Sequence, residues 1–185
     1  MQPVDSPIID LRADARELID QAAGLLLDAF RNRTEDWQNP ESAREEVLAS
    51  LAPDRISRVL VHDSGSVLGW IGGISTYGGR VWELHPIVVA GSHRRQGIGR
   101  ALVQDLERVV ESRGARTLWL GSDDENGETS LSGLDLYPDV PGAIRDLRTL
   151  RGQHPHEFYL RLGFRVVGVM PDANGLGKPD IFFAK

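Results

Sequence analysis

The sequence predicts one α/β domain built on a mixed sheet, because segments with two different apolar periodicities alternate along it. In some segments apolar residues recur every three or four positions, which is the spacing of an amphipathic helix. Other segments are short, rich in β-branched and aromatic residues, and bounded by turn-forming residues, which is typical of strands. The order is roughly β, α, α, three or four β, α, β, α, β, β. The 185 residues show no repeat and suit a single domain over residues 1–185.

Four segments carry the helical pattern. The first repeats leucine, alanine and phenylalanine at helical spacing from Leu18 to Phe30. The second starts with Asn39 as an N-cap residue and Pro40 in the first turn, both typical of a helix start. The third and fourth each end at a glycine, the residue favoured just past a helix end. The predicted helices cover residues 13–30, 39–51, 101–114 and 155–164.

Strand-like segments occupy most of the remaining chain. Two of them flank a turn sequence, Asp-Ser-Gly at 63–65, and predict a hairpin over residues 57–75. The last two are joined by a loop that contains Asn-Gly at 174–175, a strong turn signal. The predicted strands outside the hairpin cover residues 82–89, 117–121, 165–170 and 180–184.

Composition and charge exclude several classes of function. Lys and Arg number 21 against 27 Asp and Glu, and a net charge of −6 makes nucleic-acid binding a poor hypothesis. The chain has no cysteine, which excludes disulfides, thiolate metal sites and cysteine nucleophiles. The five histidines show no ligand spacing beyond His154 and His156, so no metal is expected. Without a long apolar run or a signal-peptide pattern, we expect a cytoplasmic protein that binds no membrane.

The most distinctive turn is "HRRQGIGRAL" at 93–102, between a strand and a helix. Gly97 and Gly99 leave no side chain between the backbone and a ligand, and N–H groups at a helix start converge on an anion. A Walker loop requires Gly-Lys-Ser/Thr, which is absent, and a dinucleotide fingerprint requires a glycine where Leu102 stands. The alternative to phosphate binding is that the glycines serve only the geometry of the turn.

The sequence "RRQGIG" resembles the Arg/Gln-x-x-Gly-x-Gly/Ala turn of the GCN5-related N-acetyltransferases, which holds the pyrophosphate of acetyl-CoA. Three longer segments resemble the chromosomal aminoglycoside 6′-N-acetyltransferases of that superfamily. They are "YGGRVWELHPIVV", "LGSDDENGETSLSGLDLY" and "HPHEFYLRLGFRVVGVMPDANGLGKPDIFFAK", and together they cover most of residues 77–185. The resemblance implies the acyl-CoA N-acyltransferase fold, acetyl-CoA as cosubstrate, and an aminoglycoside as the acceptor. It also implies a role in antibiotic resistance and a homodimer.

The resemblance also implies which residues bind acetyl-CoA. They lie at the end of the strand 82–89, in the turn that follows it, and in the helix 155–164. The expected cofactor contacts are Ile87, Val88, Val89, Arg94, Arg95, Gln96, Gly97, Ile98, Gly99, Arg100 and Tyr159.

Acetyl transfer to an amine needs a base for the ammonium, a donor for the oxyanion and an acid for the CoA thiolate. Tyr159 matches the superfamily's late-helix tyrosine near the thioester sulfur, which makes it the expected general acid. A backbone N–H of Ile87 or a neighbour is the expected oxyanion donor. The alternative for Tyr159 is that it only packs with Phe158 and Phe164.

Three residues are candidates for the group that takes the proton from the amine or orients it. Glu83 and His85 are two positions apart, so on a regular strand they face the same side. In the resembled family the corresponding residues lie beside the acceptor amine. Asp123 follows the next strand, where related enzymes have a proposed base. We rank Glu83 and Asp123 before His85, because a lone histidine on a strand is often structural.

The polar stretch 122–153 begins with an acidic segment, which we call the acidic lip and define as residues 122–140. It contains six acidic residues and no Lys or Arg, so it can attract a polycation, although most charge runs are simply solvated surface. Tyr77 and Trp82 can stack on sugar rings or belong to the core. The expected substrate contacts are Tyr77, Trp82, Glu83, His85, Asp123, Asp124 and Asp135.

Two other functions compete with aminoglycoside acetylation. An acetyltransferase of the same fold can act on another amine, such as a polyamine, a sugar or a peptide N-terminus, because fold alone does not determine the substrate. A sensor that binds acetyl-CoA without catalysis needs the glycine turn but neither Tyr159 nor Glu83. Since both residues are present, the sensor is the weaker of the two.

Overall fold

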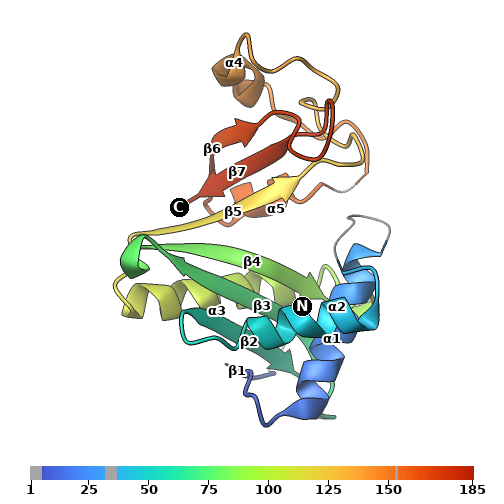
Figure 1. Ribbon diagram of the computed structural model, residues 1–185, viewed down its shortest axis with the longest axis vertical. Helices are drawn as coiled ribbons and strands as arrows, with labels where there is room; N and C mark the ends of the chain where they lie inside the picture. The colour runs from blue at the N-terminus through green and yellow to red at the C-terminus, as the bar shows by residue number, and fades with distance from the viewer. Residues whose placement is uncertain (1–5, 32–36, 153) are drawn as a thin grey trace. The chain divides into compact units, whose positions relative to one another are not determined.

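The computed structural model describes residues 6–31, 37–152 and 154–185. The chain divides into two compact units, residues 1–118 and 119–185, both drawn in Figure 1. Each unit contains antiparallel strands and helices. None of the helices in the described part of the chain has the length and apolar character needed to cross a membrane. That residues 1–185 act as one domain stays a prediction.

The first unit holds four antiparallel strands in the order β1-β2-β3-β4 and three helices (Figure 1). The strands are β1 (Ile8–Asp10), β2 (Arg55–Val61), β3 (Val67–Thr76) and β4 (Val81–Val89). The helices are α1 (Arg16–Phe30), α2 (Pro40–Ala49) and α3 (Ile98–Ser112). Single 3-10 turns, η1 (Tyr77–Gly79) and η2 (Gly91–His93), precede and follow β4.

Helices α1 and α2 cover one face of these strands. The apolar stripe of α1, which includes Ile19 and Leu26, is buried in a cluster with Trp70 of β3 and Val88 of β4. Helix α2 begins as its sequence predicts, because the Asn39 side chain accepts a hydrogen bond from the Ser42 N–H at 2.9 Å. Burying such a cluster away from water is the main free-energy gain that holds the helices on the sheet.

Helix α3 covers the opposite face, where β3 has glycines. A Cβ at Gly69 would contact the side chains of Leu102 and Ile98, and one at Gly73 would lie 3.0 Å from the Leu106 side chain. Successive strand residues alternate between faces, so Gly69 and Gly73 face away from Trp70 and its cluster. The glycines therefore let α3 approach the sheet closely. Predicted to start at residue 101, the helix starts instead at Ile98.

A β-bulge in β4 changes which face its side chains occupy. Trp70 pairs with Val88, and Gly73 pairs with Leu84, so two residues of β4, His85 and Pro86, stand opposite one residue of β3. That residue is glycine because a Cβ at position 72 would overlap the His85 carbonyl oxygen. As a result, Leu84 lies on the α3 face while Val88 lies in the α1–α2 cluster.

The second unit holds three antiparallel strands in the order β5-β7-β6 (Figure 1). They are β5 (Thr117–Asp123), which starts just before the boundary of the unit, β6 (Arg165–Met170) and β7 (Asp180–Ala184). Its helices are α4 (Val140–Arg145) and α5 (His156–Arg161). Helix α4 was not predicted from the sequence; it is capped by Asp139, whose carboxylate accepts the Gly142 N–H at 2.9 Å. The core of this unit is formed by Leu120, Leu131, Tyr159, Phe164, Ile181 and Phe183.

Candidate functional site

The turn between β4 and α3 exposes backbone N–H groups at a helix start. Gly97 is the N-cap residue of α3 with φ of 93°, a conformation that glycine adopts without strain, and no side chain caps the helix. The first N–H groups of a helix have no partner within it, so those of the following residues are available to a ligand. Arg95 also has a positive φ, of 63°, and contributes to the tight curve of the turn. The backbone thus has the form of an anion-binding site.

The side chains of the turn separate into anchors and exposed groups. Ile98 and Val88 are buried, so only their backbone can face a ligand. Arg94, Arg95, Gln96 and Arg100 are exposed. Gln96 donates to the Ser92 carbonyl at 3.3 Å, which braces the turn. Three cationic side chains around free helix N–H groups suit a pyrophosphate group.

On β4, Glu83 and His85 lie on the α1–α2 face. The His85 ring lies 5.8 Å from the ring of Trp37, centroid to centroid, and Trp37 packs against the α1–α2 cluster. Glu83 pairs with Ile74 of β3, which pairs in turn with Arg55 of β2, so Glu83 and Arg55 lie on one face. Because of the bulge, Ile87 and Val89 lie on the other face, toward α3.

The environment of Glu83 suits a base. Burial raises the pKa of this half-buried carboxyl above its usual value, and the charges of His85 and Arg55 offset only part of that effect. A carboxylate with a raised pKa is a stronger base than an exposed one. Glu83 can therefore accept a proton from an ammonium group that reaches it.

The two aromatic candidates have opposite environments. Trp82 is 3% exposed; its indole N–H donates to the Gly79 carbonyl at 3.0 Å, and the Arg113 guanidinium lies 5.3 Å from its ring. Trp82 therefore belongs to the core, one of the two roles that the sequence left open for it, and its substrate contact stays a prediction. Tyr77, in η1, is 81% exposed and available for stacking.

In the second unit, Tyr159 is buried in an aromatic cluster on α5. Its ring contacts those of Phe158, Phe164 and Phe183 at centroid distances of 5.1, 5.8 and 5.6 Å. Burial raises the pKa of the Tyr159 hydroxyl, which keeps it protonated at neutral pH. The predicted packing with Phe158 and Phe164 is thus confirmed. A protonated phenol is also the form that a general acid requires, so the catalytic role stays a prediction.

Asp123 is exposed at the end of β5 and has a partner that the sequence did not reveal. The Asn174 side chain donates to its carboxylate at 2.6 Å. Asn174 lies in the loop between β6 and β7, where the Asn-Gly sequence predicts only a turn. The amide fixes the Asp123 carboxylate while leaving it further acceptor positions.

The neighbouring Asp124 has a structural role within its own loop, and its predicted contact with substrate stays a prediction. It is 1% exposed, and its carboxylate accepts hydrogen bonds from the Glu128 and Thr129 N–H groups and the Ser132 hydroxyl at 2.6 to 2.8 Å. Burial alone would raise the pKa of Asp124, but these hydrogen bonds lower it below the ordinary 3.8. Its contribution to stability is therefore present above pH 3.8 and is lost as the pH falls below that value.

Replacing Asp124 with asparagine is expected to lower the free energy of unfolding by about 3 kcal/mol, because an amide turns an N–H₂ group toward donors. Urea denaturation measures the loss. The matched control is the same change at Asp135, which is exposed in the acidic lip and should stay within about 0.5 kcal/mol of wild type. Equal stability of the two variants would contradict this assignment.

The acidic lip presents fewer available carboxylates than its sequence suggests. Asp139 caps α4, and Asp135 accepts the Tyr137 N–H at 3.2 Å but stays exposed. Arg151, from outside the lip, donates to the carbonyls of Asn126 and Gly127. A cavity of about 740 Å³, which is lined partly by residues of the acidic lip, also has basic lining residues. Asp123 and Asp135 are both exposed and can contact a cation.

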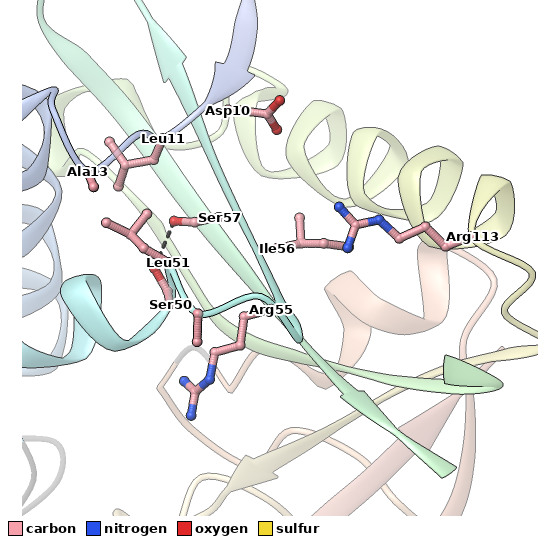
Figure 2. A pocket seen from close by; sticks show the side chains of 10 residues that line it. Asp10, Leu11, Ala13, Ser50, Leu51, Arg55, Ile56, Ser57 and Arg113 are labelled. Atoms are coloured by element: carbon pink, nitrogen blue, oxygen red, sulfur yellow. Dashed lines mark hydrogen bonds between the residues drawn. The ribbon is translucent and has the colours of Figure 1, made fainter. Parts of the chain in front are cut away.

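A smaller cavity of about 190 Å³ lies in the first unit at the end of α2 (Figure 2). Its hydroxyl groups bond to one another: Ser50 and Ser57 lie 2.8 Å apart, and Ser57 also accepts the Trp70 indole N–H at 2.9 Å. Figure 2 shows Arg55 directed away from this pair. The cavity holds no predicted site residue. The serine pair joins the C-terminal end of α2 to β2.

The described residues contain no group of three or more His, Cys, Asp or Glu side chains that could hold a metal ion. The candidate residues of the first unit are the glycine turn, Glu83, His85 and exposed Tyr77. Those of the second unit are Asp123 and Tyr159.

Known proteins resemble this chain over nearly its whole length. Residues 20–130 match the model of the acetyltransferase (GNAT) family. An aminoglycoside 6′-N-acetyltransferase complexed with coenzyme A is 41% identical with a TM-score of 0.89, and the match covers 97% of this chain and 96% of that one. The 6′-N-acetyltransferase from Enterococcus faecium is also 41% identical, with a TM-score of 0.86 and the same coverage. No curated protein matches the chain significantly.

These matches confirm the predicted α/β fold, since the likeness extends over both units at high identity. An aminoglycoside 6′-acetyltransferase type Ii, 36% identical, also matches over 97% of this chain and 96% of its own, with a TM-score of 0.73. The glycine turn lies inside the matched residues 20–130, as do Glu83 and Asp123. The chain belongs to the GNAT family of acetyltransferases.

Proposed function

We propose that the chain transfers an acetyl group from acetyl-CoA to the 6′-amine of aminoglycosides. The observation that carries the proposal is the 41% identity, over 97% of the chain, to two solved aminoglycoside 6′-N-acetyltransferases. The coenzyme A complex of one of them supports acetyl-CoA as the cosubstrate. Acetylation removes a positive charge from the antibiotic, so the enzyme confers resistance.

The glycine turn binds the pyrophosphate of acetyl-CoA in this proposal. The open N–H groups after Gly97 supply hydrogen bonds, and Arg94, Arg95 and Arg100 supply positive charge. The backbone of Ile87 to Val89 extends along the cofactor, and an N–H of Ile87 or a neighbour donates to the thioester oxygen. That hydrogen bond strengthens as the oxyanion forms.

Glu83 removes the proton from the acceptor ammonium, and Asp123 is the second carboxylate that takes part. The raised pKa of Glu83 supports its role as base, because an amine can attack only after it loses its proton. Asp123, held by Asn174, orients the amine or relays the proton. His85, Tyr77 and Asp135 supply contacts to the sugar rings and the other ammonium groups.

Collapse of the tetrahedral intermediate breaks the bond between carbon and sulfur. The carbonyl re-forms on the acetylated amine, and the sulfur leaves as a thiolate. Tyr159 donates its hydroxyl proton to that sulfur, and the raised pKa of Tyr159 keeps the proton in place until then. The proton that was taken from the ammonium passes through solvent to Tyr159 and restores its hydroxyl, so the protons balance over the reaction.

The regiochemistry tests the proposal. Kanamycin, which has a 6′-amine, should be acetylated at that nitrogen. An aminoglycoside with a 6′-hydroxyl should react at least about 100-fold more slowly, since a hydroxyl is a weaker nucleophile and has no charge for the carboxylates to hold. It should still bind and inhibit competitively through its other ammonium groups. Product mapping by NMR and inhibition kinetics on this pair give the answer.

Two outcomes would change the assignment. Acetylation at a different amine would keep the enzyme class and refute the position. No turnover of any aminoglycoside, with normal acetyl-CoA binding, would favour a different amine as the acceptor.

We further propose that the enzyme is a homodimer and acts in the cytoplasm, where acetyl-CoA is available. Light scattering of the purified protein decides the first point, and fractionation of the producing cells decides the second.

A further inference from the structure

Two histidines of the second unit are buried and have no part in the mechanism above. His154 is 5% exposed and His156 is 2% exposed, and their ring centroids lie 5.6 Å apart. They precede and begin α5, the helix that carries Tyr159. A buried imidazole that is neither a metal ligand nor a solvent-facing group requires a structural or functional reason.

The hydrogen bonds of His154 determine its tautomer. The backbone N–H of His156 donates to Nδ1 of His154 at 3.2 Å, so Nδ1 must carry a lone pair. In the neutral ring the proton is then on Nε2, which lies 3.5 Å from the Ser122 hydroxyl. Neutral His154 therefore connects the first residue of α5 to the end of β5.

Both ends of this connection adjoin residues assigned to the reaction. Ser122 immediately precedes Asp123 on β5, and His156 begins the six-residue helix in which Tyr159 lies one turn later. The helix is short, so a change at its first residue reaches Tyr159 directly. The Tyr159 N–H is held by the Pro155 carbonyl at 3.2 Å, within the same turn.

We propose that His154 is a positioning residue for acetyl transfer. Its neutral imidazole holds the start of α5, the helix that carries Tyr159, against the end of β5 that carries Asp123. Protonation of Nδ1 breaks this connection. The catalytic consequence rests on the proposed function of Tyr159 and Asp123. The connection itself does not, because it consists of contacts within the second unit.

The surroundings of His154 keep it neutral at neutral pH. Burial lowers its pKa below the ordinary 6.5, and nearby His156 lowers it further, while Asp124, Glu128 and a hydrogen bond to the Ser122 backbone oppose the effect only in part. Burial also lowers the pKa of His156. The charges of Glu157 and Asp124 raise this pKa in part, and the charge of Arg161 lowers it further. The folded protein thus binds a proton less readily than the unfolded chain. The pKa of His154 in the folded protein lies below 6.5, so the connection is intact at neutral pH and is lost as the pH falls through that lowered pKa.

The test compares two substitutions of similar shape. In His154→Asn the amide oxygen takes the place of Nδ1 and accepts the His156 N–H, but it does not titrate. In His154→Leu the acceptor is lost. We expect kcat of the leucine variant to fall by about tenfold at neutral pH with little change in KM, because a buried N–H is left without a partner. The difference from wild type should shrink at low pH, where protonation of wild-type His154 removes the same acceptor. The asparagine variant should recover most of this loss and keep more of its kcat than wild type does as the pH falls through the lowered pKa of His154.

The control is His62→Asn, an exposed histidine of the hairpin turn in the first unit, which should follow the wild-type pH profile. Two measurements on the wild-type protein test the proposal even if a variant fails to fold. Nitrogen chemical shifts from NMR should show His154 protonated on Nε2 at neutral pH. The protection of the His156 amide against hydrogen exchange, measured relative to the intrinsic rate at each pH, should fall when His154 is protonated.

Protonation on Nδ1, exchange that does not follow the titration, or an asparagine variant with the pH profile and kcat of the leucine variant would each overturn the proposal. The NMR and exchange readouts need no substrate. A failure of aminoglycoside turnover would therefore refute the proposed function and leave the connection to be decided by these two measurements.

Discussion

Replacing Tyr159 with phenylalanine is expected to lower kcat by about 100-fold and to leave the KM of both substrates nearly unchanged. Proton donation to the thiolate matters only after the amine has attacked, so binding is unaffected. The aromatic ring stays, and with it the contacts to Phe158, Phe164 and Phe183, so the variant should fold. Steady-state kinetics with acetyl-CoA and kanamycin measure the effect.

The matched control is the same change at Tyr137, which is 71% exposed and outside the aromatic cluster. Its kinetics should equal those of wild type. A loss of less than about twofold in the Tyr159 variant would assign this tyrosine to packing alone. A raised KM for acetyl-CoA with normal kcat would assign it to cofactor binding.

Replacing Gly97 with valine is expected to raise the dissociation constant of acetyl-CoA by at least about tenfold. The φ of 93° at this position is strained for a β-branched residue, and relief of the strain reorients the N–H groups that face the pyrophosphate. No protein atom lies within 4 Å of a Cβ added at Gly97, so the side chain points into space open to the ligand. Isothermal titration calorimetry with acetyl-CoA measures the change.

Gly114→Val is the matched control. Gly114 follows the other end of α3, has φ of 85°, and likewise has nothing within 4 Å of an added Cβ. The two variants should lose similar stability, while only the change at Gly97 weakens acetyl-CoA binding. Equal affinity in both would place the cofactor elsewhere.

Local sequence patterns predicted most elements because those elements follow from short-range rules. Asn39 and Pro40 define the start of α2 wherever the helix packs, since capping and a fixed φ act within one turn. The hairpin of β2 and β3 follows in the same way from its turn residues. Helix α4 was not predicted, because it has only six residues and none of them is buried. It therefore shows no apolar periodicity.

The extent of burial distinguishes the roles of residues that look alike in the sequence. Asp123 and Asp124 are adjacent and chemically identical, yet one is exposed and held by Asn174 while the other is enclosed by the loop it stabilises. The hydrogen bonds to Asp124 come from up to eight positions away, and no periodicity encodes them. Trp82 illustrates the same limit, because the Arg113 guanidinium that lies over its ring comes from the end of α3, far along the sequence.

Sequence patterns alone predict the glycine turn, the alternation of strands and helices, and the position of Glu83 and His85 on one face of their strand. The three-dimensional structure was needed to show that Ile87 and Val89 lie on the opposite face, because a period of two places all four residues on the same face. The extra residue of the bulge breaks that period. It fits because position 72, on the neighbouring strand, is a glycine that admits the His85 carbonyl, a condition that no pattern within β4 can reveal.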